Sequence, residues 1–374
     1  MAKGYFRKRG DKWSFTVDIG RDPKTGKRKQ KTVSGFRTKK EAEAACAELL
    51  NQLNKGYYIE QSNQTLGEYL EEWLNDFAKT KVKPSTFKNY KNAVYGRIIP
   101  ELGKIRLKDL KLHHGQKFVN MLVKEGKRPS YVVGLYRILH VALEQAVKLE
   151  KIPRNPFDGV ECPSLKREKK KTWTVEEAKR FLQFAKLDSP IYYMAFLIAI
   201  HTGMRKGEVL GLRWQDIDFE RKRLSVTQSL VKVQGKYIIS DLKTTSSSRV
   251  ITLDDVLISE LKKHKTLQNQ QKLLLGGGYK DLDLVCANEF GDYLSPNTIN
   301  HKMAQICEKA QVPKIRFHDL RHTHATWLLQ LGENVKVVSE RLGHSSTTIT
   351  LDVYSHVTPD MQEQAAEKIK KIMG

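Results

Sequence analysis

The sequence is poor in the features that build disulfide-linked, zinc-binding or membrane-spanning proteins. Among its 374 residues are four cysteines, Cys46, Cys162, Cys286 and Cys307, which lie far apart and form no CxxC pair. This spacing argues against a zinc ribbon and against a disulfide framework, and it predicts four reduced thiols. The longest apolar stretch, residues 191–200, is too short to span a bilayer and predicts a buried helix.

A secretion signal is also lacking. Residues 1–10 carry four basic side chains, but no apolar run follows them. A signal peptide needs such a run, so we expect a cytoplasmic protein.

Acidic residues are scarce relative to basic ones. The chain has 66 Lys and Arg against 42 Asp and Glu, a formal net charge of +24 and a pI near 9.7. The electrostatic field of so basic a protein attracts polyanions, and double-stranded DNA is the leading candidate partner. With 40% hydrophobic and 29% charged residues the chain should bury a real core. Its length favours two or three domains, and we expect three.

The first region, residues 1–60, is expected to form a small sheet and one helix. Residues 13–20 alternate as a strand, residues 22–26 form a turn, and residues 29–36 return. Thr38 and Glu41 then open a helix that runs to about Asn54. Residues 1–64 hold fifteen Lys and Arg against seven Asp and Glu. Such a basic unit either inserts strands into a DNA groove, with Lys27, Arg28 and Lys29 as candidate contacts, or is merely a solvated surface.

The second region, residues 65–160, is expected to be a helical bundle. Thr65 and Glu68 form a capping box before an apolar helix face, and further helices begin near residues 84, 108 and 129, the last running to Ile152. A linker, residues 161–173, follows. Residues 166–171 supply five cations in six positions and either face phosphates or simply keep the linker solvated. The candidate DNA contacts here are Lys166, Arg167, Lys169, Lys170 and Lys171.

The last region, residues 174–374, opens with the capping pair Thr174 and Glu177. Helices alternate with strand-like runs at residues 223–233, 236–240 and 249–253, and helical patterns return from residue 296. The fold class is therefore mainly α with small β-sheets, α+β in three domains.

Four local motifs lie in this last region: TGMRKGE at 202–208, LKTTSSSR at 242–249, HDLRHTHAT at 318–326 and LGHSSTTITLDVYSH at 342–356. Together they resemble the tyrosine recombinase family, in particular phage and integrative-conjugative-element integrases with an N-terminal arm-binding domain. The resemblance covers all three regions and implies a helical, SAM-like core-binding domain before the catalytic domain. Carried over position by position, it implies the catalytic set Arg205, Lys243, His318, Arg321, His344 and Tyr354. Some family members carry Trp where this chain has His344.

The chemistry of DNA strand transfer calls for these residue types. Attack on a phosphodiester builds negative charge that two guanidinium groups, Arg205 and Arg321, can neutralise. A phenol with a pKa near about 10 is a weak nucleophile, so Tyr354 needs nearby cations and a proton acceptor such as His318. The expelled 5′ oxygen needs a proton, which Lys243 on a hairpin can donate. His344 is expected to hydrogen-bond the phosphate. No cofactor, ATP or metal is expected, because a phosphotyrosine bond retains the energy of the broken bond.

Each of these residues also has an ordinary structural interpretation. Arg205 can be a surface ion-pair residue, Lys243 a solvated turn lysine and Tyr354 a core aromatic at helical spacing from Leu351. The three histidines at 318, 322 and 324 can be read as metal ligands, although no glutamate accompanies them and Arg321 would repel a cation. The C-terminal residues Met361, Ala365, Ile369 and Ile372 form an apolar helix face that docks on its own domain or on a neighbouring protomer.

The expected function is a site-specific recombinase that integrates, and excises, a mobile element such as a viral genome through a 3′-phosphotyrosyl intermediate. The family resemblance further implies a tetramer on core-type and arm-type attachment sites, with an excisionase and a host DNA-bending protein as partners. A chromosome-resolving recombinase, a type IB topoisomerase and an inert DNA-binding regulator are the alternatives.

Overall fold

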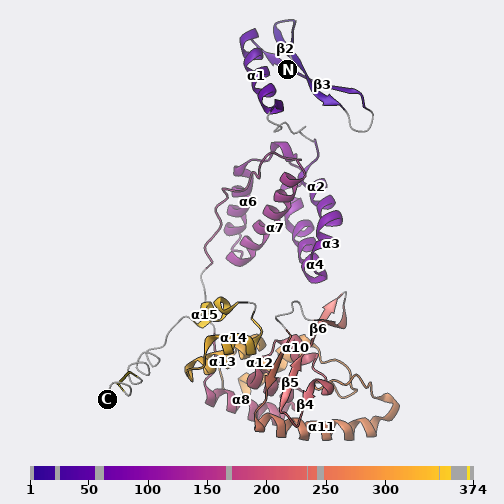
Figure 1. The fold of residues 1–374 in the computed structure, drawn as a ribbon, viewed down its shortest axis with the longest axis vertical. Coiled ribbons are helices and arrows are strands. Elements are labelled where there is room, and N and C mark those ends of the chain that lie inside the picture. The colour runs from indigo at the N-terminus through magenta and orange to yellow at the C-terminus, as the bar shows by residue number, and fades with distance from the viewer. Residues whose placement is uncertain are drawn as a thin grey trace. The chain divides into compact units, whose positions relative to one another are not determined.

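The computed structural model describes residues 4–21, 26–54, 63–165, 171–233, 235–241, 248–344, 346–354 and 369–370 (Figure 1). The chain divides into two compact units, Met1–Lys166 and Arg167–Gly374. The first unit holds two separate apolar cores, one in the sheet and helix near the N-terminus and one in a helical bundle. The α+β class with three kinds of domain is therefore confirmed. No helix in these ranges is long and apolar enough to cross a membrane.

The N-terminal sheet has three antiparallel strands in the order β1 (Tyr5–Arg9), β2 (Lys12–Arg21) and β3 (Arg28–Phe36). Helix α1 (Lys39–Asn54) packs on the sheet, and its first turn is capped as expected, with the Glu41 amide donating to the Thr38 hydroxyl. The core they share is small, with Phe15, Val17, Ala42 and Cys46 as its buried apolar members.

The helical bundle runs from α2 (Leu66–Trp73) to α7 (Pro129–Lys148) through α3 (Lys79–Lys81), α4 (Pro84–Ala93), α5 (Ile99–Leu102) and α6 (Leu112–Lys124). The predicted capping box is present, since Thr65 and Glu68 each accept the other's backbone N–H. Two π-helical turns, Leu74–Ala78 and Val94–Ile98, were not expected from the sequence. Helix α7 ends at Lys148, four residues before the expected Ile152, because Glu150 adopts a left-handed backbone with φ 54°.

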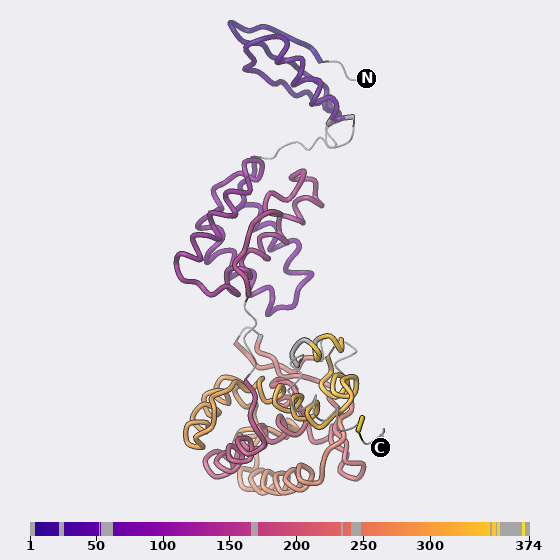
Figure 2. Tube along the Cα trace, turned by 90° about the vertical axis from the view of Figure 1, so that its left-hand side faces the viewer, coloured from indigo at the N-terminus to yellow at the C-terminus, as the bar shows by residue number. Residues whose placement is uncertain are grey.

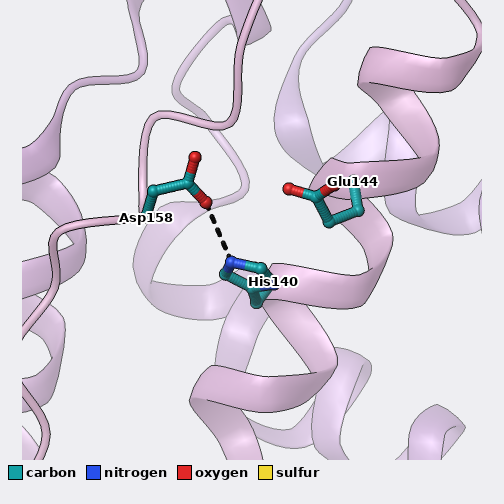
Figure 3. Close-up of side chains that lie close together, drawn as sticks. All are labelled: His140, Glu144 and Asp158. Carbon is teal, nitrogen blue, oxygen red and sulfur yellow. Dashed lines mark hydrogen bonds and ion pairs between the residues drawn. The ribbon is translucent and has the colours of Figure 1, made fainter.

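The segment after α7 returns along that helix and is tied to it by polar side chains. The ring of His140 lies 2.9 Å from a carboxylate oxygen of Asp158 (Figure 3). The nearby Glu144 accepts a hydrogen bond from the side-chain amide of Asn155 at 2.8 Å. Phe157 is fully buried in the bundle core. These contacts make residues 155–160 part of the bundle.

The second unit begins with α8 (Val175–Asp188) and the buried α9 (Pro190–Thr202), which confirms the helix expected over residues 191–200. Helix α13 (Phe317–Gln330) packs against α9, and α14 (Val335–Leu342) packs against α13 and strand β8 (Arg249–Thr252) (Figures 1 and 2). The remaining helices are α10 (Lys206–Leu210), α11 (Asp255–Leu275), α12 (Pro296–Lys309) and α15 (Thr347–Tyr354). The Thr174 capping box expected from the sequence is present at α8.

The strands of this unit form two small sheets. The expected strand run over residues 223–233 divides at Thr227 into β5 (Arg223–Val226) and β6 (Gln228–Val233). Strand β5 pairs with β4 (Ile217–Asp218) and β8, whereas β6 pairs with β7 (Lys236–Asp241). The four cysteines are free thiols, as predicted, and three of them are buried.

Candidate active site

Arg205 lies where the buried helix α9 gives way to the short helix α10. Gly203 ends α9 in the left-handed region, at φ 67°, and turns the chain so that Arg205 caps α10. Its Nη1 donates to Glu208 Oε1 at 2.8 Å and its Nη2 to the carbonyl oxygen of Gly343 at 2.7 Å. The side chain keeps 37% of its surface exposed, so the oriented guanidinium is still open to a phosphate.

Arg321 reaches the same turn from α13. It is 2% exposed, and its Nη1 donates to the carbonyl oxygen of Gly203 at 2.9 Å. Because Gly203 is two residues before Arg205, this hydrogen bond brings the two arginines expected to hold the phosphate to one place. Two guanidiniums in one site form a cationic centre suited to a phosphodiester.

His318 and His344 lie within the field of both arginines. Burial, Arg321 and Arg205 lower the pKa of His318, and the same influences lower the pKa of His344 to about 4. Both rings are therefore neutral at neutral pH. His318, on the first turn of α13, is only partly covered by its neighbours, so its neutral ring can accept a proton. The Nδ1 of His344 lies 2.8 Å from the hydroxyl oxygen of Thr350. When Nδ1 accepts a hydrogen bond from that hydroxyl, the proton of the neutral ring is on Nε2, which can donate a hydrogen bond to a phosphate.

The metal interpretation of the histidine cluster finds no support at His324. Arg341 Nε donates a hydrogen bond to His324 Nε2 at 3.1 Å, and His324 Nδ1 lies 2.8 Å from the carbonyl oxygen of Ile200. Both nitrogens are thus engaged, and burial lowers the pKa of His324 to about 4. Within the described ranges, the one group of three metal-ligand side chains is His140, Glu144 and Asp158, which belongs to the helical bundle (Figure 3).

Several residues singled out in the sequence lie outside the described residues: Lys243, Lys166, Arg167, Lys169, Lys170, and the C-terminal Met361, Ala365 and Ile372. Lys243 belongs to the connection between β7 and β8, and Tyr354 is the last residue of α15. Lys27, Arg28 and Lys171 are exposed, and Lys29 is partly buried. Arg28 pairs with Asp18 across the hairpin.

Sequence reasoning missed two residues that hold this centre together. Glu208 and Arg249 are 2% and 6% exposed, and Arg249 Nη2 donates to Glu208 Oε2 at 2.9 Å. Burial by itself would raise the pKa of Glu208, but hydrogen bonds from Arg249 and Arg205 hold the pKa below its ordinary value. Both residues end a quoted motif, yet only the folded chain shows that the two motifs meet.

The fold and this cationic centre define an enzyme of DNA strand transfer, and comparison with known proteins gives the same class. The phage integrase family matches residues 171–361, its N-terminal SAM-like domain matches residues 65–123, and an arm DNA-binding domain matches residues 5–53. A tyrosine recombinase XerC-like protein of Caldanaerobacter subterraneus subsp. tengcongensis is 33% identical over 393 residues, covering all of both chains. The ICEBs1 integrase of Bacillus subtilis is 27% identical over 96% of this chain and 97% of its own.

Solved structures show the same architecture. The Tn1549 transposon integrase in complex with a circular intermediate DNA has a TM-score of 0.70 at 22% identity, over 82% of this chain and 99% of its own. A lambda integrase dimer bound to a COC′ core site has a TM-score of 0.58 at 20% identity, over 94% of each chain. The chain belongs to the phage integrase family. It is a tyrosine recombinase, an enzyme that breaks and rejoins DNA strands.

Proposed function

We propose that this recombinase integrates and excises a mobile element, with Tyr354 as its nucleophile. The Tyr354 oxygen attacks the scissile phosphorus while the bond from phosphorus to the 5′ oxygen breaks, which leaves a 3′-phosphotyrosyl bond. His318 takes the phenol proton, and Lys243 gives a proton to the departing 5′ oxygen. A 5′ hydroxyl then attacks the phosphotyrosine and reverses these steps. If the hydroxyl belongs to the strand that was cut, the original DNA is restored; if it belongs to another cut strand, the two DNAs are recombined.

The convergence of Arg205 and Arg321 at Gly203 is the observation that carries this proposal. Two guanidiniums close to the same two histidines suit the non-bridging oxygens, whose charge grows in the transition state. His344, neutral and half-buried beside them, donates a further hydrogen bond to the phosphate. The conserved bond energy of the phosphotyrosine makes ATP unnecessary, and the two arginines supply the charge neutralisation for which other phosphoryl-transfer enzymes use a metal.

Each domain has its own DNA in this proposal. Residues 1–60 bind arm-type sites, while residues 65–160 and 174–374 enclose the crossover site, joined by the linker 161–173. The match of residues 5–53 to an arm DNA-binding domain and the basic balance of this region support the first assignment. Lys27, Arg28 and Lys29 are the proposed arm contacts, and Lys166, Arg167, Lys169, Lys170 and Lys171 the proposed linker contacts.

We propose a tetramer as the active assembly, in which the C-terminal tail of one protomer docks on its neighbour. A lambda integrase tetramer bound to a Holliday junction shares the fold, with a TM-score of 0.58. An excisionase and a host DNA-bending protein are proposed to set the direction of the reaction in the bacterial cytoplasm.

Chromosome resolution is the second candidate, since the relative of 33% identity is described as XerC-like. The arm DNA-binding domain favours integration, because an enzyme that resolves chromosomes at one short site does not require a second DNA-binding domain for distant sites. A topoisomerase would relax plasmids lacking any special site, and an inert regulator would function with Arg321 replaced. Recombination between plasmids bearing the element's attachment sites distinguishes these alternatives.

The central experiment uses a nicked duplex that carries the crossover core, read from the junctions between the element and the chromosome. The full-length protein should form a covalent adduct that survives denaturing electrophoresis, and the Tyr354→Phe variant should form none while still binding the duplex. An adduct formed by Tyr354→Phe would overturn the assignment of the nucleophile.

A further inference from the structure

Arg249, the first residue of β8, is a buried arginine that pairs with the same glutamate as Arg205. Its side chain is 6% exposed. Its Nη2 donates to Glu208 Oε2 at 2.9 Å, and its Nε donates to the carbonyl oxygen of Arg341 at 2.7 Å. A buried guanidinium is costly unless its partners are well placed, so a buried arginine with these partners calls for an explanation beyond packing.

Arg249 and Arg205 share the carboxylate of Glu208 as a partner, and both lie against Gly343. Glu208 accepts from Arg205 with one carboxylate oxygen and from Arg249 with the other. Gly343 accepts from Arg205 Nη2 with its carbonyl oxygen, and its Cα faces Arg249 so closely that an added Cβ would lie 2.9 Å from Arg249 Nη1. One terminal nitrogen of Arg205 is therefore bound by a carboxylate that Arg249 also binds, and the other is bound by a residue whose Cα lies close to Arg249.

Arg341 on α14 is a second arginine, and each of the two donates a hydrogen bond to the backbone of the other's element. Arg249, on β8, donates to the backbone of Arg341 near the end of α14, and Arg341 Nη1 donates to the backbone of Thr252 on β8 at 3.1 Å. Strand β8 follows the segment that contains Lys243, and α14 leads through Gly343 to His344 and α15. The two arginines thus join β8 to α14, the elements that follow Lys243 and precede Tyr354 in the sequence.

We propose that Arg249 is a positioning residue for recombination: through Glu208 and the Gly343 turn, it fixes the guanidinium of Arg205 for the scissile phosphate. This inference rests on the proposed function, in which Arg205 neutralises the phosphate. A lysine at position 249 keeps the charge but lacks the planar fork that reaches Glu208 and the Arg341 carbonyl together. Arg205 would then lose its fixed orientation, and small misplacements of such groups cost large factors in rate.

The test compares cleavage of two nicked crossover duplexes by the full-length protein. One has a normal scissile phosphate, and the other has an uncharged methylphosphonate in which a methyl group replaces one non-bridging oxygen. The second substrate builds up less negative charge and depends less on the arginine clamp. We expect Arg249→Lys to slow cleavage of the phosphate by about 10- to 100-fold and to slow cleavage of the methylphosphonate much less.

The ratio of the two rates is taken on one protein preparation, so it does not depend on the fraction that is folded. Glu208→Gln should shift the ratio in the same direction, because it weakens the link between the two arginines. The matched control is Arg213→Lys, which alters another arginine paired to a carboxylate, at Asp216 in the same unit, and should leave the ratio unchanged. An equal loss on both substrates would mean that Arg249 only ties β8 to α14, and no loss on either would also overturn the inference.

If Arg205 does not neutralise the phosphate as the proposed function requires, the ratios of the two cleavage rates differ from those expected above. Arg205→Lys must itself shift the ratio, and by more than Arg249→Lys, if Arg205 neutralises the phosphate. An unshifted ratio in Arg205→Lys would refute the proposed clamp, whereas a shift in Arg205→Lys without one in Arg249→Lys and Glu208→Gln would refute only the positioning role.

Discussion

Arg205 donates a hydrogen bond of 2.7 Å to the carbonyl oxygen of Gly343, across 138 residues of sequence. The contact joins the start of α10 to the turn between α14 and α15. That turn carries His344 and precedes Tyr354, so the orientation of Arg205, the proposed phosphate ligand, and the path of the segment with the proposed nucleophile depend on each other.

Gly343→Ala should therefore impair cleavage more than DNA binding. Gly343 has φ 68°, where alanine is strained by about 1 kcal/mol, and its Cβ would lie 2.9 Å from Arg249 Nη1 and 3.1 Å from Arg249 Cδ. The turn must shift to relieve this contact. We expect adduct formation to fall by at least about tenfold while gel-shift affinity stays within a few-fold. Gly126→Ala is the control, because Gly126 has a similar φ of 69° but open space around it; equal behaviour of the two variants would contradict the prediction.

Arg205→Lys should lower the cleavage rate by about 10²- to 10³-fold, the typical cost of losing one preorganised donor at a developing charge. Lysine cannot contact Glu208 and the Gly343 carbonyl while also facing a phosphate with a second nitrogen. Binding of the crossover duplex, measured by gel shift, should change little, because many phosphates contribute to it. Arg221→Lys, at a side chain 77% exposed on the same unit, should cleave normally. A normal rate in Arg205→Lys would remove this residue from the catalytic set.

The parts of this site differ in how far the sequence could predict them. Capping at Thr65 and Thr174 depends on residues three apart, so local sequence predicts it. The catalytic set was predicted from motif order together with a family resemblance. The pairing of Glu208 with Arg249 joins residues 41 apart through the pairing of β5 with β8, and no local pattern encodes it. For the same reason the run at residues 223–233 suggested one strand where the fold makes two in different sheets.

The stability of the enzyme should fall between pH 6.5 and pH 4, partly through His324. Burial, together with Arg341, lowers the pKa of this ring to about 4 in the folded state, against about 6.5 in an unfolded chain. Between these values the unfolded chain binds a proton that the folded chain does not, so stability is lost as the pH falls, by up to about 3 kcal/mol from this group. Above pH 6.5 the loss is absent.

His324→Gln checks this assignment, because an amide can accept from Arg341 and donate to the Ile200 carbonyl without titrating. The free energy of urea unfolding, followed by tryptophan fluorescence from pH 6.5 to 4.5, should depend less steeply on pH than in the unchanged protein. His301→Gln, at an exposed position on α12, should keep the original slope. Parallel slopes for His324→Gln and the unchanged protein would show that His324 does not contribute.

The N-terminal domain should be separable from catalysis by a single core substitution. Phe15 is 1% exposed and stacks on Phe36 with ring centroids 5.7 Å apart. Replacing a buried phenylalanine with alanine costs about 3–5 kcal/mol, and so small a domain rarely has more stability than that. Phe15→Ala should unfold the sheet and abolish binding to arm-type DNA. The catalytic unit has its own core, so adduct formation on the nicked crossover duplex should persist. Tyr5→Ala, at an aromatic 71% exposed on β1, should leave the sheet folded; loss of adduct in Phe15→Ala alone would instead make the N-terminal domain a requirement for cleavage.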